Sequence, residues 1–508
     1  MAIGAVSLLV TMAISVLLDR AVRPRLTRRR SWPGLALHLS VTTGLFGLFL
    51  AISGNMPVAG ALAVALLLLF VIASNAKYAM LGEPLLFSDL ALFAALVRHP
   101  SFYLTALSTR QKAGAAIVAA GLLLALAWLF VPHLLPHLVG VGLLLAAAGA
   151  ILALLGGGAC ATLARTPDMP ADLAKHGLAA SLLLYWLRWR ETPDPPASPT
   201  LAAGEGEPVA DPEPPELILV VQCESFADPV ELTGDGELAL PGLARARTMA
   251  WQWGDLAVSG FGAYTMRTEF GVLFGRSEAA LGFRRYDPFL TARGEASYAL
   301  SARLGAWGYR SLFVHPHDLR FYGRDRLMPA IGFDRLVGEE SFPPVAPGNG
   351  RYVNDRTLGA SLGTLIDAAT GPTFIYAVTM ENHGPWMKER VSGSPGGLDA
   401  YLHHVRSSDG MLTDLIDHLA RTGRPALLVF FGDHRPSIPG VTEPTPVRHT
   451  PYVMLRFSSD GKIIPNDDGR VNLTPDELHH AILHAARVER GATTGRPRSA
   501  VNPSANEG

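Results

Sequence analysis

The chain has few cysteines and almost no net charge. Only two cysteines, Cys160 and Cys223, occur in 508 residues. A disulfide between them is not expected, so the cysteine content does not assign the protein to an oxidising or a reducing compartment. The 43 basic residues (Lys and Arg) nearly equal the 44 acidic ones, which leaves a formal net charge of -1. The chain lacks the basic surplus typical of nucleic-acid-binding proteins, and we predict no nucleic acid partner.

Long apolar runs are confined to the first third of the chain, although the mean hydropathy of the whole is +0.24. Five runs approach or reach the length of a membrane-spanning helix, at about residues 2–18, 35–53, 58–75, 113–131 and 137–158. A cleaved signal peptide carries its basic residues before the apolar run. Here the first run is instead followed by Arg20, Arg23, Arg25, Arg28, Arg29 and Arg30. The sequence therefore predicts a multi-pass membrane anchor.

The side of the membrane on which the rest of the chain lies depends on the number of spans. The positive-inside rule places the loop Arg20–Arg30 in the cytoplasm, so five spans leave the remainder there too, whereas an even number places it outside. Residues 85–96 or 178–187 could form a short extra crossing, although each is below the usual length. Residues 178–187 are equally compatible with an amphipathic helix at the membrane interface. The sequence leaves these alternatives open.

Residues 191–215 are rich in Pro, Ala, Gly and acidic residues and contain nothing that can build a core. We interpret them as a linker that lets the following domain stand off the membrane. The predicted organisation is a transmembrane helical domain (1–160), an interfacial helix and linker (161–215), a catalytic domain (216–490) and a disordered tail (491–508). A domain of about 275 residues is large enough for one α/β unit.

Four short apolar runs in the second half of the chain each end in acidic residues or histidines. The runs are Leu217–Gln222 before Glu224, Tyr309–Val314 before His315 and His317, Thr373–Met380 before Glu381 and His383, and Ala426–Phe431 before Asp433 and His434. Such runs, separated by helical stretches, predict a mostly parallel sheet covered on both faces. Because parallel sheets bind ligands at the carboxyl ends of their strands, we expect these polar residues to converge on one edge.

Carboxylates and an imidazole in this arrangement suggest a metal site. Glu224, Asp433 and His434 supply hard oxygen ligands and one nitrogen ligand, a set that suits one divalent ion such as Mn²⁺ or Zn²⁺.

A nucleophile for this site is expected in Gly260–Phe270 (GFGAYTMRTEF). Its two glycines permit a tight turn, after which Thr265 would begin a helix whose amide groups and dipole favour negative charge. A bound dication would lower the pKa of the Thr265 hydroxyl. Thr268 is the rival nucleophile. Sequence chemistry alone is also compatible with Thr265 being no more than a helix N-cap.

Five segments carry a resemblance to a known family: Gln222–Phe226 (QCESF), Gly260–Phe270, His315–Asp334 (HPHDLRFYGRDRLMPAIGFD), Glu381–Pro385 (ENHGP) and Gly432–His434 (GDH). In this order they resemble the sulfatase-like phosphoglycerol transferases, a family that includes the lipoteichoic acid synthases and the transferases that modify periplasmic glucans. Leu81–Leu90 (LGEPLLFSDL) also looks like a stretch that these proteins carry between spans. The resemblance implies an α/β domain of the alkaline phosphatase and sulfatase type, with a central, mostly parallel sheet, behind an N-terminal α-helical transmembrane bundle.

The resemblance also implies roles for individual residues. One divalent ion, Mn²⁺ or alternatively Zn²⁺ or Mg²⁺, would be bound by Glu224, Thr265, Asp433 and His434. Thr265 would also be the nucleophile. The phosphoglycerol head group would be held by His315, Tyr322, Arg324 and His383, with Tyr322 standing where the synthases usually have tryptophan. The chemistry of two of these side chains supports the same roles. Arg324 is suited to bidentate hydrogen bonds with a phosphate, and His383 is suited to proton exchange with a hydroxyl.

The function that the resemblance implies is transfer of glycerophosphate from phosphatidylglycerol to a glycan or glycerophosphate polymer acceptor, through a phosphothreonyl-type intermediate on Thr265. It further implies the bacterial cytoplasmic (inner) membrane, with the catalytic domain outside the cytoplasm, against the five-span count. The alternatives are a phosphoethanolamine transferase, a phosphodiesterase or sulfatase that lets water take the second step, and an inactive membrane scaffold. Sulfatases, however, need an oxidised cysteine or serine where this chain has threonine.

Overall fold

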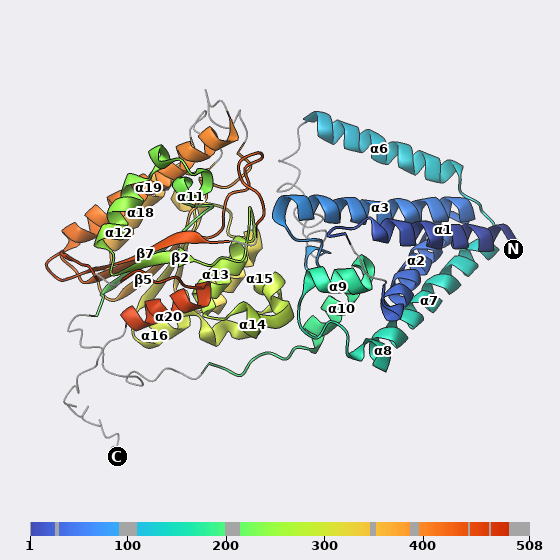
Figure 1. Ribbon diagram of the computed structural model, residues 1–508, viewed down its shortest axis with the longest axis horizontal. Coiled ribbons are helices and arrows are strands. Elements are labelled where there is room, and N and C mark those ends of the chain that lie inside the picture. Colours follow the sequence, from blue (N-terminus) through green and yellow to red (C-terminus); the bar gives the residue numbers. More distant parts are fainter. Residues whose placement is uncertain are drawn as a thin grey trace, which may run out of the picture.

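The structure of the protein, a computed structural model, describes residues 2–25, 30–90, 109–198, 214–345, 352–386, 396–445, 448–466 and 469–486. Figure 1 shows a helical part, formed by the first 198 residues, beside an α/β part formed by the rest. Several predicted features lie wholly or partly outside the described residues: the tail at 491–508, most of the linker, Arg28 and Arg29, and the end of the 85–96 segment.

Helices occupy the positions of all five apolar runs: α1 (Ala2–Arg20), α2 (Trp32–Ser53), α3 (Met56–Leu81), α6 (Thr109–Trp128) and α7 (Leu134–Gly156). Among the described residues, α2, α3 and α7 are long and apolar enough to cross a membrane. Glycines let α2 and α7 approach closely, since a Cβ added at Gly140 of α7 would lie 2.3 Å from the backbone nitrogen of Ala51 in α2. The predicted N-terminal helical bundle is confirmed.

Arg30, just before α2, is bound to two other helices of the helical part. Arg30 forms an ion pair of 2.7 Å with Asp19 of α1 and donates to the carbonyl of Leu173 in α9 (Met169–His176). The next helix, α10 (Leu178–Glu191), contacts the α/β part, where Trp189 donates to the carbonyl of Thr291. Arg30 is thus linked, through α1 and α9, to the part of the helical bundle that lies next to α10 and the α/β part.

Residues 178–187 form the first part of α10 rather than an extra crossing. This helix has 14 residues and lies between the two parts of the protein, with the ring of Tyr185 stacked on that of Tyr286 at 5.6 Å. The helix α8 (Gly158–Ala161) connects α7 to this region. The α/β part contacts the helical part directly, through α10 and through the segment after α3.

The α/β part is built on one eight-stranded sheet in the order β2-β7-β6-β1-β5-β3-β4, with β8 paired to β7. Strands β6, β1, β5, β3 and β4 run parallel, and β7 runs antiparallel to β6, β2 and β8. The bounds are β1 (Leu217–Cys223), β2 (Gln252–Leu256), β3 (Arg310–Val314), β4 (Arg335–Val337), β5 (Thr373–Val378), β6 (Ala426–Gly432), β7 (Thr450–Phe457) and β8 (Ile463–Ile464). The four predicted runs are β1, β3, β5 and β6, and the mostly parallel sheet is confirmed.

Helices cover both faces of the sheet, so every residue of β1, β5 and β6 is buried. One face packs against α12 (Pro241–Met249), α18 (Asp355–Asp367) and α19 (Gly397–Thr422). The other packs against α13 (Thr265–Phe274), α16 (Leu300–Ala306) and α20 (Pro475–Ala485) (Figure 1). The connections contain α11 (Pro229–Thr233), α14 (Glu278–Leu281), α15 (Pro288–Thr291) and α17 (Arg324–Ala330). This covered sheet leaves its strand ends as the place where polar residues gather.

Candidate active site

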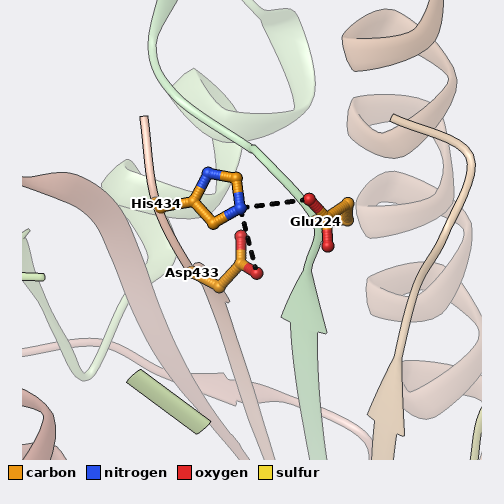
Figure 2. A group of neighbouring side chains, drawn as sticks. All are labelled: Glu224, Asp433 and His434. Carbon is orange, nitrogen blue, oxygen red and sulfur yellow. Dashed lines mark ion pairs between the residues drawn. The ribbon is translucent and has the colours of Figure 1, made fainter. Parts of the chain in front are cut away.

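Three predicted metal ligands meet at the carboxyl ends of two neighbouring strands. Glu224 follows β1 and the pair Asp433 and His434 follows β6, and these strands are in parallel register with Cys223 opposite Gly432. Figure 2 shows the three side chains pointing toward one another. His434 Nε2 lies 3.2 Å from Glu224 Oε1 and 3.8 Å from Asp433 Oδ2. Their ligand atoms all lie within 4.8 Å of one another, a spacing that one ion can bridge.

The charges of this group favour a cation. Burial would raise the pKa of Glu224, but the neighbouring His434 lowers it to about 2. Burial and the charge of Glu224 raise the pKa of Asp433 to about 7. Burial would lower the pKa of His434, yet the two carboxylates raise it to about 9. Two buried carboxylates thus share one imidazole, which is the setting in which a divalent ion displaces protons.

One buried oxygen of the group accepts no hydrogen bond from the described residues. Asp433 Oδ1 accepts a 2.8 Å hydrogen bond from the backbone nitrogen of Ser225, whereas Asp433 Oδ2 is buried and without a hydrogen-bond partner among the described residues. Buried carboxylate oxygens are rarely left in this state unless they bind an ion or water. The residues present therefore fit a divalent metal ion.

Thr265 faces this group from the start of α13. Its Oγ1 lies 3.4 Å from Glu224 Oε2. The N-cap of the helix is Tyr264, with φ 78° and ψ 30°, so Thr265 is the first helical residue and its hydroxyl caps nothing. The alternative in which Thr265 is only an N-cap is therefore wrong. A left-handed tyrosine costs about 1 kcal/mol or more, and such strain is typical of functional turns.

Thr268, the rival nucleophile, is fully buried, and its hydroxyl donates a 2.7 Å hydrogen bond to the carbonyl of Asp433. The hydroxyl therefore ties α13 to the end of β6 and is not directed at the three ligands. This arrangement favours Thr265 as the nucleophile.

The two histidines expected to hold the head group lie at the ends of β3 and β5. His315 is buried, and its Nδ1 bonds the carbonyl of Val378 at 3.0 Å, while its Nε2 has no partner among the described residues. Burial, with the charge of Arg324, holds the pKa of His315 well below its usual range, so the ring is neutral. His383 Nδ1 lies 2.8 Å from the carbonyl of Gly384. Both rings thus have one nitrogen fixed by the main chain.

Arg324 makes an ion pair that the sequence did not reveal. Its Nε and Nη2 bind Glu269 of α13 at 3.1 and 2.5 Å, and both side chains are almost fully buried. Its guanidinium also lies 5.1 Å from the ring centre of Tyr322. Glu269 therefore occupies Nε and Nη2, the two nitrogens expected to bind a phosphate in a bidentate manner. Nη1 is the remaining nitrogen that could donate to a phosphate. Glu269 belongs to the quoted Gly260–Phe270 segment, but nothing in its local pattern marks it as the partner of Arg324.

A second group of possible ligands, Glu231, Asp255 and His449, lies at the surface. Glu231 already pairs with His449 at 2.9 Å and with Arg435 at 3.5 Å. Because neighbouring side chains balance its charge, this group is weaker than the buried one as a metal site.

Known proteins are similar to this chain over both of its parts. A family model described as Sulfatase matches residues 216–487. "Capsular polysaccharide biosynthesis protein RkpI" of Rhizobium meliloti (strain 1021) is 31% identical over 513 residues, which cover 94% of this chain and 94% of that protein. "Putative cyclic beta-1,2-glucan modification protein" of the same strain is 28% identical over 233 residues, 44% of this chain and 36% of that protein.

A solved structure shares the arrangement of the whole chain. The integral membrane protein lipooligosaccharide phosphoethanolamine transferase A (EptA) from Neisseria meningitidis is similar over 95% of each chain, with 14% sequence identity and a TM-score of 0.55. At this identity the likeness concerns the fold, including the helical part. Together with the family match over the α/β part, it leads to one conclusion: the chain belongs to the sulfatase family and carries its sulfatase-like domain behind apolar N-terminal helices.

Proposed function

We propose that the protein is a membrane-anchored, metal-dependent phosphoglycerol transferase that moves glycerophosphate from phosphatidylglycerol to a saccharide polymer. The observation that carries this proposal is the hydroxyl of Thr265, which faces the buried Glu224, Asp433 and His434 from the first turn of α13. These residues would hold one divalent ion, Mn²⁺ in the first place, and Thr265 would be its fourth protein ligand. When bound, the ion would lower the pKa of the hydroxyl and polarise a phosphoryl oxygen.

The reaction consists of two displacements at phosphorus. First, the Thr265 hydroxyl loses its proton and Oγ1 forms a bond to the phosphorus of the head group, while the bond to the diacylglycerol oxygen breaks and that oxygen takes a proton to leave as diacylglycerol. Second, an acceptor hydroxyl loses its proton and attacks the phosphorus, and the bond to Thr265 Oγ1 breaks as that oxygen takes a proton back. His383 is the residue we assign to proton exchange with these oxygens. His315, Tyr322 and Nη1 of Arg324 would hold the glycerophosphate.

The choice of donor and acceptor rests on the helical part and on the relatives. Helices long enough to cross a bilayer keep the site beside phospholipid, which cannot leave the membrane cheaply. The relatives named for capsular polysaccharide biosynthesis and glucan modification support a glycan acceptor. Such acceptors support a site outside the cytoplasm of a bacterium. We therefore propose the cytoplasmic membrane, with the α/β part on its outer side.

The same geometry also suits a phosphoethanolamine transferase, and the whole-chain fold likeness to EptA favours that second candidate. Mass spectrometry of the purified protein, incubated with phosphatidylglycerol or with phosphatidylethanolamine, distinguishes the two. We expect a glycerophosphoryl adduct on the peptide that contains Thr265 and no adduct in Thr265→Ala. A phosphoethanolamine adduct would move the assignment to the second candidate.

A hydrolase or an inactive scaffold would behave differently in the same experiment. A phosphodiesterase would release free glycerophosphate without any added acceptor, because water would take the second step. A scaffold would form no adduct with either lipid. We expect the adduct to persist until a saccharide acceptor is added.

A further inference from the structure

The end of α3 lies against the turn that presents Thr265. The carbonyl of Met80 accepts a 3.5 Å hydrogen bond from Ser437 Oγ, and a Cβ added to Gly262 of the turn would lie 2.4 Å from the Cβ of the same Ser437. Gly82 also lies close to the α/β part, since an added Cβ would lie 3.1 Å from the Cβ of Pro444. The end of α3 thus contacts residues that pack against the turn Gly260–Tyr264, which precedes Thr265.

Glu83, which follows α3, forms a bidentate ion pair with Arg267. Glu83 Oε1 accepts from Nη1 at 3.2 Å and Oε2 from Nη2 at 2.8 Å, although 184 residues separate the two. The side chains are 14% and 7% exposed, so water screens the pair little. Arg267 Nε donates to the carbonyl of Tyr286 at 3.1 Å, which fixes the guanidinium plane. A bidentate pair between a guanidinium and a carboxylate fixes the orientation of the arginine side chain as well as stabilising its charge.

Arg267, which is bound by Glu83, also contacts the ring of Tyr264. Its guanidinium carbon lies 3.9 Å from the centre of the Tyr264 ring, and Lys77 Nζ of α3 lies 5.5 Å from the same ring. Lys77 is itself held by Asp89 at 2.5 Å. Two cations, one from the helical part and one bound by it, therefore contact the residue whose left-handed backbone starts α13. A tyrosine keeps this conformation only where its surroundings hold it.

We propose that Glu83 is a positioning residue for catalysis. Through Arg267 it holds Tyr264 in the left-handed conformation, and Tyr264 in turn keeps Thr265 Oγ1 directed at Glu224. This inference rests on Thr265 being the nucleophile, as proposed above. It means that the catalytic domain attains its full rate only when docked against the helical part, beside the lipid that supplies the head group.

The test uses the full-length protein with vesicles of phosphatidylglycerol and phosphatidylcholine. We compare wild type, Glu83→Gln, Arg267→Gln and the double variant. Asp194→Asn is the control, because Asp194 also joins the segment after α10 to the α/β part, through Arg284 at 3.3 Å, and among the described residues this arginine makes no hydrogen bond or ion pair with Tyr264 or Thr265. The readouts are the single-turnover rate of adduct formation on Thr265 and the affinity for Mn²⁺ by calorimetry.

We expect Glu83→Gln to slow adduct formation by about tenfold to 100-fold, since small misplacements of a nucleophile have effects of this size. The affinity for Mn²⁺ should fall by less than the rate does, because Glu224, Asp433 and His434 remain in place and only Thr265, the fourth proposed ligand, is displaced. The double variant should be no slower than Arg267→Gln alone, because Glu83 acts through Arg267. Asp194→Asn should react at the wild-type rate.

The inference is overturned if Glu83→Gln reacts as fast as Asp194→Asn, or if the effects of the two single variants add. It is also overturned if the affinity for Mn²⁺ falls in parallel with the rate, because that result indicates a general structural role. Should Glu83→Gln not fold, Arg267→Lys decides, since it keeps the charge and loses the fork, and a wild-type rate there contradicts the inference. Absence of any adduct in wild type would instead reject the proposed function.

Discussion

The hydroxyl of Thr268 donates a 2.7 Å hydrogen bond to the carbonyl of Asp433, so the helix that begins with Thr265 is tied to the strand end that carries two of the proposed metal ligands. The proposed nucleophile and the proposed metal site are therefore held in one unit. Thr268 lies three residues after Thr265, yet the two hydroxyls serve different purposes.

The variant Thr268→Val should distinguish the structural role of the Thr268 hydroxyl from the proposed nucleophilic role of the Thr265 hydroxyl. Loss of the hydroxyl leaves a buried carbonyl without its donor, which costs about 1 to 3 kcal/mol of unfolding free energy. We expect a lower thermal unfolding temperature and a slower formation of the Thr265 adduct, with the adduct still on Thr265. Thr268→Ser, which keeps the donor, is the control. An adduct lost altogether in Thr268→Val but present in Thr265→Ala would make Thr268 the nucleophile.

The affinity for Mn²⁺ should increase with pH. Below about pH 7 the carboxyl of Asp433 holds a proton, because burial and the charge of Glu224 raise its pKa to about 7. His434, whose pKa is raised to about 9 by the two carboxylates, must lose its proton as well. Binding therefore displaces protons, and each proton displaced contributes about tenfold in affinity per pH unit. Calorimetry between about pH 6 and pH 8, in buffers of different ionisation enthalpy, measures both the affinity and the proton release. An affinity independent of pH would contradict the assignment of these ligands.

Glu269→Gln should destabilise the α/β part. Arg324 and Glu269 are 1% and 0% exposed, so removing the carboxylate leaves a buried guanidinium without its counter-charge. Breaking a buried pair in this way costs about 3 kcal/mol. Thermal unfolding of the purified protein checks the loss. Asp414→Asn, which breaks the exposed pair with Arg356 at 3.0 Å, is the control and should leave the unfolding temperature almost unchanged.

Gly432→Ala should damage the metal site without touching a ligand. A Cβ at Gly432 would lie 1.9 Å from the carbonyl oxygen of Phe226, so β6 must move away from the loop after β1. That movement separates Glu224 from Asp433 and His434, and we expect the affinity for Mn²⁺ to fall by at least about tenfold. Gly305→Ala, where an added Cβ meets nothing within 4 Å, should bind the metal as wild type does. Equal affinities in the two variants would contradict this reading of the strand register.

The strand ends could be predicted from the sequence because their signal is local. An apolar run followed directly by Glu224 or by Asp433 and His434 indicates both the strand and the edge at which the side chains lie. The motif order then pointed to the sulfatase family, which the family match confirms. The helical part was predictable for the same reason, since span length is read directly from a run of apolar residues.

The contacts that complete the site could not be predicted in this way. Arg324 with Glu269 and Arg267 with Glu83 join residues 55 and 184 positions apart, and neither pair leaves a local pattern. The left-handed backbone conformation of Tyr264 could not be predicted either. The glycines at positions 260 and 262 already account for a tight turn, so nothing in the sequence indicates that a tyrosine adopts a positive φ. The contacts of Arg267 with Glu83 and of Trp189 with Thr291, which join the α/β part to the helical part, leave no pattern in the linker composition either.

One measurement tests the central claim directly: an anomalous difference map from crystals of the full-length protein grown with Mn²⁺. We expect a single peak between the ends of β1 and β6, within about 2.0 to 2.6 Å of oxygens of Glu224, Asp433 and Thr265 and of a nitrogen of His434. A map with no peak there, or with the Thr265 hydroxyl turned away from the ion, would contradict it.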